Sequence, residues 1–321
     1  MKVKTKAVLG QLSDMDFRLL QVFRSVVDCG GMAAAGLELN IGISTVSRHI
    51  KDLEQRLKLT LCSRGRAGFA LTAEGERIYE ETQRLLASAD AFRASVDDIH
   101  RRMGGQLHVA VFDKTASNPA CKISAAVALF AEQAPEVALN FHVATINMIE
   151  RGVIDGQFQV GIIPAHRSSD SLSYDTLFGE TMQLYCGAGH PLFGADDADL
   201  DWNSIRAWQF AGLGYHSPNM ELSQQVRLPR RATGFDQESI ATLILSGRFL
   251  GFLPDHYARG FVEDGKMRAV RPALFRYHCD FVAILRGSPL PSRVAQAFRR
   301  CLLAAHGLEA GARQDQRAPG G

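Results

Sequence analysis

The chain has 321 residues, of which 46% are hydrophobic and 22% are charged. This composition is typical of a folded protein with two or three domains, each with its own core. No run of about 18 uncharged apolar residues is present, which argues against a membrane-spanning helix and against a membrane as partner. The amino-terminal segment MKVKTKAVLGQLSDMDF is basic but has no apolar stretch, so we expect no secretory signal and a cytoplasmic protein.

The net charge of +2 is unevenly distributed along the chain. Residues 1–71 contain 11 Lys and Arg against 6 Asp and Glu, a net charge of +5, whereas residues 72–321 have a net charge of −3. A small basic segment ahead of a slightly acidic body predicts a head that binds a polyanion and a body with a different role.

The six cysteines of the chain are widely separated. No two of them form a C-x-x-C pair, which argues against a zinc knuckle and against a thioredoxin-like motif. We therefore expect reduced thiols, no bound metal and no cofactor. The cysteines are Cys29, Cys62, Cys121, Cys186, Cys279 and Cys301.

Two helices are predicted in the first forty residues. The segment SDMDFRLLQVFRSVVDCG places apolar residues from Phe17 to Val27 on one helical face, with Ser13 or Asp14 as its N-cap. The segment MAAAGLELN predicts a short second helix of small residues, which a neighbouring helix can approach closely. A tight turn at NIG then leads into a third helix, and this order is typical of a helix-turn-helix.

The third helix, GISTVSRHIKDLEQRL at residues 42–57, has two unlike faces. Val46, Ile50, Leu53 and Leu57 fall on one line and must be buried. The opposite face carries hydroxyl and cationic side chains, which fit base edges and phosphates in the DNA major groove. The alternative is an ordinary solvated helix face. The predicted base-edge contacts are Ser44, Thr45 and Arg48, and the predicted phosphate contacts are Ser47, Lys51 and Gln55.

A basic hairpin is predicted directly after this helix. The segment LTLCSRGRAGFALT contains two short extended runs around a cluster of Arg and Gly. Arg64 and Arg66 at its tip are expected to contact the DNA backbone or minor groove. Residues 13–71 are therefore predicted to form a winged helix-turn-helix domain that binds double-stranded promoter DNA.

Residues 72–103 are predicted to form one long polar helix, which begins at Thr72. Its apolar residues recur at alternating spacings of 4 and 3, the pattern of a coiled-coil seam. So narrow a seam predicts a dimer, and a two-fold dimer presents two recognition helices to two half-sites. The alternative is that the seam packs against the chain's own body. The predicted dimer contacts are Ile78, Leu85, Phe92, Val96 and Ile99.

Residues 105–307 alternate predicted strands and helices, beginning with the strands QLHVAVF, VALNFHVA and FQVGIIP. This βαβαβ pattern, repeated after Leu184, predicts two α/β lobes with parallel sheets. The first lobe comprises about 105–164 and 270–307, and the second about 165–269, with crossings at IIPAHR and FLPDH. Residues 308–321 are predicted to be a disordered tail.

The cleft between these lobes is the predicted ligand site, because open parallel sheets bind ligands beyond the carboxyl ends of their strands. Helix N-termini favour anions, so we expect a small polar or anionic metabolite. Each Ser or Thr taken alone is more often an ordinary helix cap. The predicted contacts are Thr115, Ser117, Thr145 and Asn147 from the first lobe, and His216 and Ser217 from the second.

The segments AAAGLELNIGISTVSRHIKDLEQRLKLTLCSR and FALTAEG, within residues 16–75, resemble the amino-terminal domain of LysR-type transcriptional regulators. The later segments GQFQVGIIP, LYCGAGHPLF and LILSGRFLGFLPDHYARGFVEDGKMRAV resemble the effector-binding domain of the same family. Ile43 stands where the family often has Gln, and Gly31, Lys58 and Cys62 replace a usual Ser, Gly and Phe. Without that amide, the base preference at residue 43 differs from the family pattern.

This resemblance implies an α/β protein with an N-terminal winged helix-turn-helix, a long linker helix, and a two-lobed α/β effector domain like a periplasmic solute-binding protein. It also implies a homodimer or homotetramer whose promoter binding responds to an unknown small-molecule effector. RNA polymerase is a further candidate partner.

Sequence motifs of common enzymes are missing, among them G-x-S-x-G, H-E-x-x-H, the Walker loop and G-x-G-x-x-G. The pairs Cys186 with His190 and His278 with Cys279 are candidates for a thiol nucleophile or a metal site, and Cys186 or Cys121 for a redox sensor. We favour a non-enzymatic transcription factor. The alternatives are a thiol-based redox-sensing regulator and, from another class, a small-molecule enzyme or a solute-binding module.

Overall fold

The computed structural model describes residues 9–65, 68–99 and 103–308. The chain divides into two compact units, Met1–Arg93 and Ala94–Gly321. Each unit is treated by itself below. Within the described ranges, no helix is both long and apolar enough to cross a membrane.

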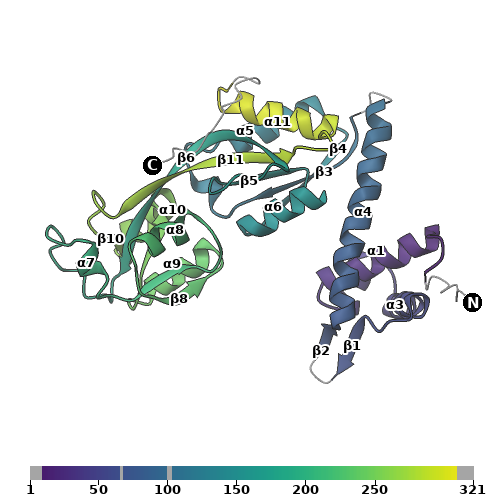
Figure 1. Ribbon diagram of the computed structural model, residues 1–321, viewed down its shortest axis with the longest axis horizontal. Helices are drawn as coiled ribbons and strands as arrows, with labels where there is room; N and C mark the ends of the chain where they lie inside the picture. The colour runs from purple at the N-terminus through teal and green to yellow at the C-terminus, as the bar shows by residue number, and fades with distance from the viewer. Residues whose placement is uncertain (1–8, 66–67, 100–102, 309–321) are drawn as a thin grey trace, which may run out of the picture. The chain divides into compact units, whose positions relative to one another are not determined.

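The first unit consists of short helices, a hairpin and most of one long helix (Figure 1). Phe23 and Val26 of the first helix and Val46 and Ile50 of the third are fully buried in one core. Gly36 permits the tight connection to the third helix, because a Cβ there would lie 2.9 Å from the carbonyl oxygen of Ile41. The elements are α1 (Asp14–Asp28), α2 (Met32–Glu38), α3 (Ile43–Leu57), β1 (Cys62–Gly65), β2 (Gly68–Leu71) and α4 (Ala73–Ile99).

An ion pair between a buried Asp and an exposed Arg joins α1 to α3. Ser13 and Asp16 form a capping box at the start of α1, and the Asp16 side chain is only 3% exposed. Arg56 of α3 donates to both carboxylate oxygens of Asp16, and its Nη2 lies 2.9 Å from Oδ2. The bonds from Arg56 hold the pKa of Asp16 at about 2. This contact fixes α3 against α1.

The second unit is built on one 9-stranded sheet with the order β4-β3-β5-β11-β6-β9-β7-β8, and β10 pairs with β6. Its strands are β3 (Gly105–Val111), β4 (Val137–Val143), β5 (Val160–Pro164), β6 (Leu172–Gly187), β7 (Phe210–Leu213), β8 (Arg230–Gly234), β9 (Leu250–Pro254), β10 (Met267–Ala269) and β11 (Arg276–Arg286). Its helices are η1 (Thr115–Ser117), α5 (Ile123–Gln133), α6 (Ile146–Asp155), α7 (Trp202–Ile205), α8 (Pro218–Gln225), α9 (Gln237–Leu245), α10 (Asp255–Glu263) and α11 (Arg293–Ala305).

Two lobes share this sheet. In the first lobe, α5 and α11 lie together on one face of the strands and α6 lies on the other (Figure 1). Phe130 of α5 meets Phe298 of α11 edge to face, with ring centroids 5.3 Å apart. Gly161 lets α6 approach β5 closely, because a Cβ there would lie 2.6 Å from a methyl of Ile149. The predicted α/β fold class is confirmed.

The connection between the lobes corrects two details of the sequence prediction. β6 and β11 run antiparallel, and β11 pairs with β5 of the first lobe while β6 pairs with β9 of the second. These two long strands therefore make the sheet mixed rather than parallel, and they make both crossings. The crossing predicted at FLPDH is wrong: Pro254 ends the buried strand β9, and Asp255 begins α10 of the second lobe.

Candidate functional site

The outward face of α3 is the candidate nucleic-acid interface of the first unit. Ser44, Arg48, Lys51 and Gln55 are exposed, whereas Thr45 and Ser47 are half-buried. Among the described residues, neither Arg48 nor Lys51 forms an ion pair, so both charges face solvent. Gly42 caps α3 without a side-chain hydrogen bond, which leaves backbone N–H groups at its first turn for an anion such as a phosphate.

Ile43, the first residue of α3, is 57% exposed and belongs to the same outward surface. An exposed Ile offers no hydrogen bond to adenine but can contact the methyl group of thymine. The structure thus places the main departure from the family pattern where it can touch a base.

The wing residues lie on a short hairpin. β1 and β2 pair antiparallel, with Arg64 opposite Phe69 and Gly65 opposite Gly68. Arg66 lies outside the described residues.

The seam predicted on α4 divides into two parts. Ile78 and Leu85 pack against the core of the first unit. Phe92 is 71% exposed and Val96 is 38% exposed, while the side chain of Ile99 lies outside the description. The second half of the seam therefore presents apolar side chains to solvent, which costs free energy in an isolated chain.

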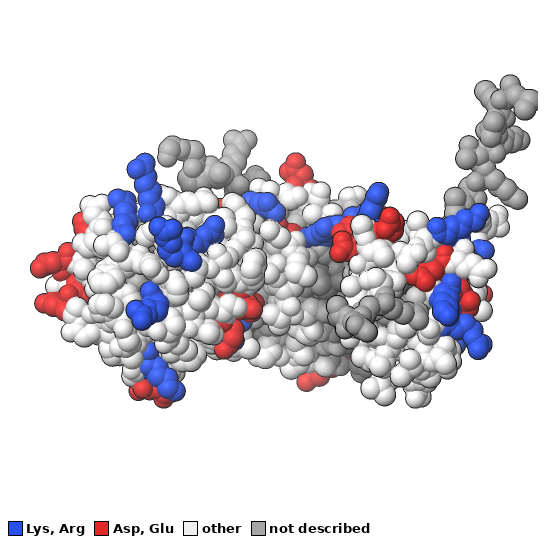
Figure 2. Space-filling model, turned by 90° about the horizontal axis from the view of Figure 1, so that it is seen from below, with Lys and Arg blue, Asp and Glu red and all other residues white. Residues whose placement is uncertain are grey.

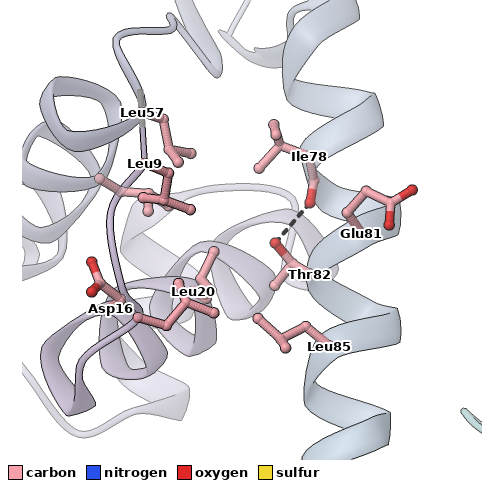
Figure 3. Close-up of a pocket in the computed structure, with 10 residues that line it drawn as sticks. Leu9, Asp16, Leu20, Leu57, Ile78, Glu81, Thr82 and Leu85 are labelled. Atoms are coloured by element: carbon pink, nitrogen blue, oxygen red, sulfur yellow. Dashed lines mark hydrogen bonds between the residues drawn. The ribbon is translucent and has the colours of Figure 1, made fainter. Parts of the chain in front are cut away.

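An apolar groove that is open to solvent lies beside the first half of the seam. Figure 3 shows Leu9, Leu20 and Leu57 on one side of it, and Ile78 and Leu85 of α4 on the other. Leu and Ile make up most of its lining, with Asp16, Glu81 and Thr82 beside them, so it suits an apolar side chain rather than a polar ligand.

Charged side chains do not form one continuous patch on the face shown in Figure 2, where Lys and Arg stand in small groups among uncharged and acidic residues. The basic character of the chain is therefore local, and the outward face of α3 contributes to it.

In the second unit, a cavity of about 260 Å³ opens between the two lobes. It is the candidate ligand site, since it lies beyond the carboxyl ends of β3 and β7. Its walls include Phe112 and Ile146 from the first lobe, Glu180 and Tyr277 from the crossing strands, and Ser217 and Gln237 from the second lobe.

Of the six ligand contacts predicted from the sequence, Ser217 lines this cavity. Thr145 is the N-cap of α6, next to the lining residue Ile146, and Asn147 is exposed on the same helix. His216 is exposed and lies 3.3 Å from Glu221. The other two belong to η1, in which Thr115 is buried and Ser117 is exposed and bonded elsewhere.

A chain of polar contacts runs behind the cavity wall from one lobe to the other. The Ser117 hydroxyl lies 2.9 Å from Nδ1 of His256, and Nε2 of His256 lies 2.9 Å from Oε2 of Glu180. The side chains of Glu180 and His256 are each 3% exposed. Burial raises the pKa of Glu180, although the His256 bond opposes that shift.

A second polar group, missed in the sequence analysis, lies at the start of α9. Asp113, which follows β3, accepts a hydrogen bond from the backbone N–H of Gln237 at 2.7 Å. Burial raises the pKa of Asp113 to about 6. Its position directly after a strand was a signal available in the sequence, whereas Glu180 lies within a strand and gave none.

The thiols have the properties of buried structural cysteines. Burial raises the pKa of Cys186 to about 11 and also raises the pKa of Cys279 and Cys121. A thiol with a raised pKa is mostly protonated at neutral pH and reacts slowly with oxidants. Over the described ranges, no group of three or more His, Cys, Asp or Glu is placed to hold a metal ion.

Comparison with known proteins identifies both parts of the chain. Residues 17–76 match the family model described as "Bacterial regulatory helix-turn-helix protein, lysR family", and residues 100–307 match "LysR substrate binding domain". The chain is 39% identical over 290 residues to the HTH-type transcriptional activator BauR of Pseudomonas aeruginosa, covering 90% of this chain and 95% of that protein. It is 29% identical to the probable regulator LrrA of Synechococcus elongatus, over 63% of this chain and 66% of that one.

Solved structures agree on the fold. The crystal structure of CbnR, a LysR family transcriptional regulator, superposes with a TM-score of 0.60 at 17% identity, covering 90% of this chain and 99% of that one. Full-length CbnR complexed with its target DNA gives a TM-score of 0.59 at 20% identity, with the same coverage.

A helix-turn-helix head joined to a two-lobed α/β body defines a transcriptional regulator that binds DNA and responds to an effector. The chain belongs to the LysR family of these regulators. That family consists of regulators rather than enzymes, so the enzymatic alternative is not favoured. The raised pKa values of the buried thiols do not favour the redox-sensing alternative.

Proposed function

We propose that this regulator binds a promoter site through α3 and that a small molecule in the interlobe cavity changes this binding. The observation that carries the proposal is that one chain contains both a helix whose outward face has hydroxyl and cationic side chains and a cavity between two lobes. A ligand that binds one arrangement of the lobes better than another shifts the equilibrium between them. The chain acts in the cytoplasm, without catalysis, and RNA polymerase is its further partner.

On DNA, α3 enters the major groove with its first two turns. Ser44, Thr45 and Arg48 face base edges there, and Ser47, Lys51 and Gln55 hold phosphates. Arg64 and Arg66 of the hairpin contact the backbone or minor groove beside it. The exposure of most of these side chains on α3 supports this assignment.

The DNA-binding form is a homodimer or a homotetramer. Phe92 and Val96 of α4, both exposed, and Ile99 after them supply the partner contacts. Ile78 and Leu85 contribute through the apolar groove that they line. Two copies related by a two-fold axis place two α3 helices on two half-sites of a partly palindromic sequence.

Sequencing the fragments of its own genome that purified full-length protein retains tests the proposal. We expect a shared element with two half-sites, about one helical turn or a multiple of it apart. The matched control is the double variant Arg48→Ala, Lys51→Ala, which should retain no common element. Equal enrichment by both proteins, or no shared element with the parent, would contradict DNA reading by α3.

The proposed response to an effector is tested on a genomic DNA fragment that the protein retains. Metabolites are added one by one, and the footprint and affinity are recorded with the parent protein and with Ser217→Ala and Thr145→Val. An effector that changes the footprint should bind several-fold less tightly to a variant that loses one hydrogen bond to it. If the substitutions at Ser217, Thr145, Thr115, Ser117, Asn147 and His216 all leave binding unchanged, the contacts are misplaced.

A further inference from the structure

The polar wall of the interlobe cavity includes a buried hydrogen-bond acceptor, Oε1 of Gln237, that lacks a donor among the described residues. Gln237 lines the cavity and is 2% exposed, yet its Oε1 has no hydrogen-bond partner among the described residues. Oδ1 of Asp113, at the neighbouring N-terminus of α9, is likewise buried without a partner. Buried acceptors without donors are uncommon in folded proteins and call for an explanation.

Glu180 adds a carboxylate to the same wall. Its Oε2 is bonded to His256, whereas the contact described for its Oε1 is the thiol of Cys279 at 4.0 Å, a weak donor. The described residues that line the cavity include this one acid and no Lys or Arg. The wall is therefore acidic and has spare acceptor capacity.

The basic groups nearest to these acceptors are engaged elsewhere. Nζ of Lys114 lies 2.5 Å from Glu238 and 4.5 Å from the centre of the Tyr257 ring. His256 is held between Ser117 and Glu180. Neither side chain supplies the missing donors at Gln237.

The helix N-termini of the second lobe that face the cavity already hold oxygen atoms of the protein. At α8, the Ser217 hydroxyl accepts from the N–H of Met220, and Pro218 has no N–H to offer. At α9, Asp236 accepts from the N–H of Ser239 and Asp113 from that of Gln237. An anion therefore finds few free N–H groups at either helix. Of the polar or anionic ligand expected from the sequence, the anionic kind is disfavoured at these helices.

We propose that the effector carries a protonated amine, which donates hydrogen bonds to Gln237 and lies beside Glu180 in the interlobe cavity. This inference rests on the proposed role of the cavity as the effector site. An ammonium group has three donors and no acceptor, so it matches the unpaired oxygen of Gln237 and the weakly bonded Oε1 of Glu180. A carboxylate in the same place would add a like charge next to Glu180.

The rest of the cavity selects for a small hydrocarbon body. Phe112, Ile146, Met182 and Leu213 line it with apolar surface. The cavity is narrow in this arrangement of the lobes, so the lobes must part to admit even a small ligand. We therefore expect a small amine with a short carbon chain. The α6 N-terminus, whose N-cap Thr145 makes no side-chain capping bond, also admits a zwitterion.

Three probes with four carbon atoms each separate charge from hydrophobicity: n-butylamine, n-butyrate and n-butanol. Their binding to full-length protein at neutral pH is measured by ligand-observed NMR. We expect n-butylamine to bind with a dissociation constant about tenfold lower than either of the others, which corresponds to about 1.4 kcal/mol. Tighter or equal binding of n-butyrate, or no binding of n-butylamine, overturns the proposal.

Two variants locate the amine. Glu180→Gln preserves the shape of the side chain and removes its charge. It should weaken the binding of n-butylamine about tenfold and leave the binding of n-butanol unchanged. Gln237→Glu adds a carboxylate at the unpaired acceptor and should strengthen n-butylamine. The matched control is Glu132→Gln, the same change on the exposed surface of α5, which should have no effect. Equal n-butylamine affinity in Glu180→Gln and Glu132→Gln overturns the assignment.

The same protein samples are titrated with operator DNA, so that failure of the ligand class and failure of the proposed function can be told apart. Parent protein that binds no specific DNA contradicts the proposed function. If the parent protein binds its operator normally but prefers n-butyrate, only the proposal that the effector is an amine is contradicted.

Discussion

Arg48 and Lys51 lie one turn apart on the exposed face of α3 but should respond differently to mutation. A guanidinium can bind guanine through two hydrogen bonds, whereas an ammonium on phosphate carries no base information. Arg48→Ala should therefore weaken specific binding by about 1–3 kcal/mol and relax the preference at one base pair. Lys51→Ala should weaken binding to all DNA sequences alike. Titrations with the operator and with a scrambled duplex measure both affinities. If Arg48→Ala lowers the two affinities equally, Arg48 is a phosphate contact.

The ion pair between Asp16 and Arg56 should make the stability of the first unit depend on pH. Asp16 has a folded pKa of about 2, below its usual unfolded value of about 3.9, so its charge stabilises the unit above pH 4. This contribution is lost as the pH falls from about 4 through 2. Since Arg56 is 41% exposed, solvent screens part of this interaction, so Asp16→Asn should lower the free energy of unfolding only modestly at neutral pH.

Urea unfolding of full-length protein, followed through the amide NMR signals of α1 and α3, measures this loss at several pH values. Asp14→Asn is the matched control, because Asp14 is an exposed carboxylate in the same helical turn. The difference between the two variants should shrink below pH 4. A difference that persists unchanged at pH 2 would show that the Asp16 charge is not its cause.

At the residue scale, helical periodicity was sufficient to predict which residues of α3 are buried. It was insufficient to predict the polar residues around the cavity. The line of Val46, Ile50 and Leu53 is buried in the structure because a period of 3.6 residues is a local property. Glu180 and His256 are 76 residues apart and meet only through the tertiary fold. No local pattern marks such a pair, so the polar network behind the cavity could not be predicted.

At the element scale, α4 is a helix with an internally packed first half and an apolar, exposed second half. Phe92→Asp should therefore break self-association without unfolding the first unit, because a charge on this surface would be buried in the partner helix. Sedimentation should show a shift toward monomer, together with weaker operator binding. Arg93→Asp, a change to the same residue type at the next exposed position, is the control. A Phe92→Asp protein that remains dimeric would place the dimer contact elsewhere.

Leu85→Asp tests a different contact on the same helix. Leu85 packs on the core of the first unit, so this change should also lower the stability of that unit. The seven-residue repeat did not distinguish the two halves of the seam, since both follow the same spacing. The two halves differ only in the tertiary structure, where the core of the first unit packs against Ile78 and Leu85.

Strands show the same limit of local patterns. β5 and β9 are short, buried and apolar, and both were recognisable as strands in the sequence. β6 extends over 16 residues, but Asp175, Gly179 and Glu180 interrupt its apolar character. Its length comes from pairing with β11, and long-range pairing overrides local propensity. For that reason the second crossing was misplaced at FLPDH rather than in β11.

At the scale of the second unit, the lobes are joined by β6 and β11 and held by contacts from the segment that follows β3. Asp113 bonds to α9, and Ser117 bonds to α10 through His256. Two continuous strands permit hinge motion, while side-chain contacts between lobes set how often the cavity opens. Ligand affinity should therefore depend on residues that never touch the ligand.

Lys114 and Glu238 test this dependence, because they form a salt bridge of 2.5 Å between the lobes. Glu238 is 65% exposed and Lys114 is 26% exposed, so the pair should contribute at most about 1 kcal/mol. In Glu238→Gln, amide hydrogen exchange in η1 and the first turn of α9 should accelerate by less than about fivefold. The charge swap Lys114→Glu, Glu238→Lys should restore slow exchange, and about 1 M salt should abolish the difference between parent and Glu238→Gln. Acceleration that survives high salt, or that the swap fails to reverse, would mean that the lobes are held by packing and by the buried bonds of Asp113 and Ser117 rather than by this ion pair.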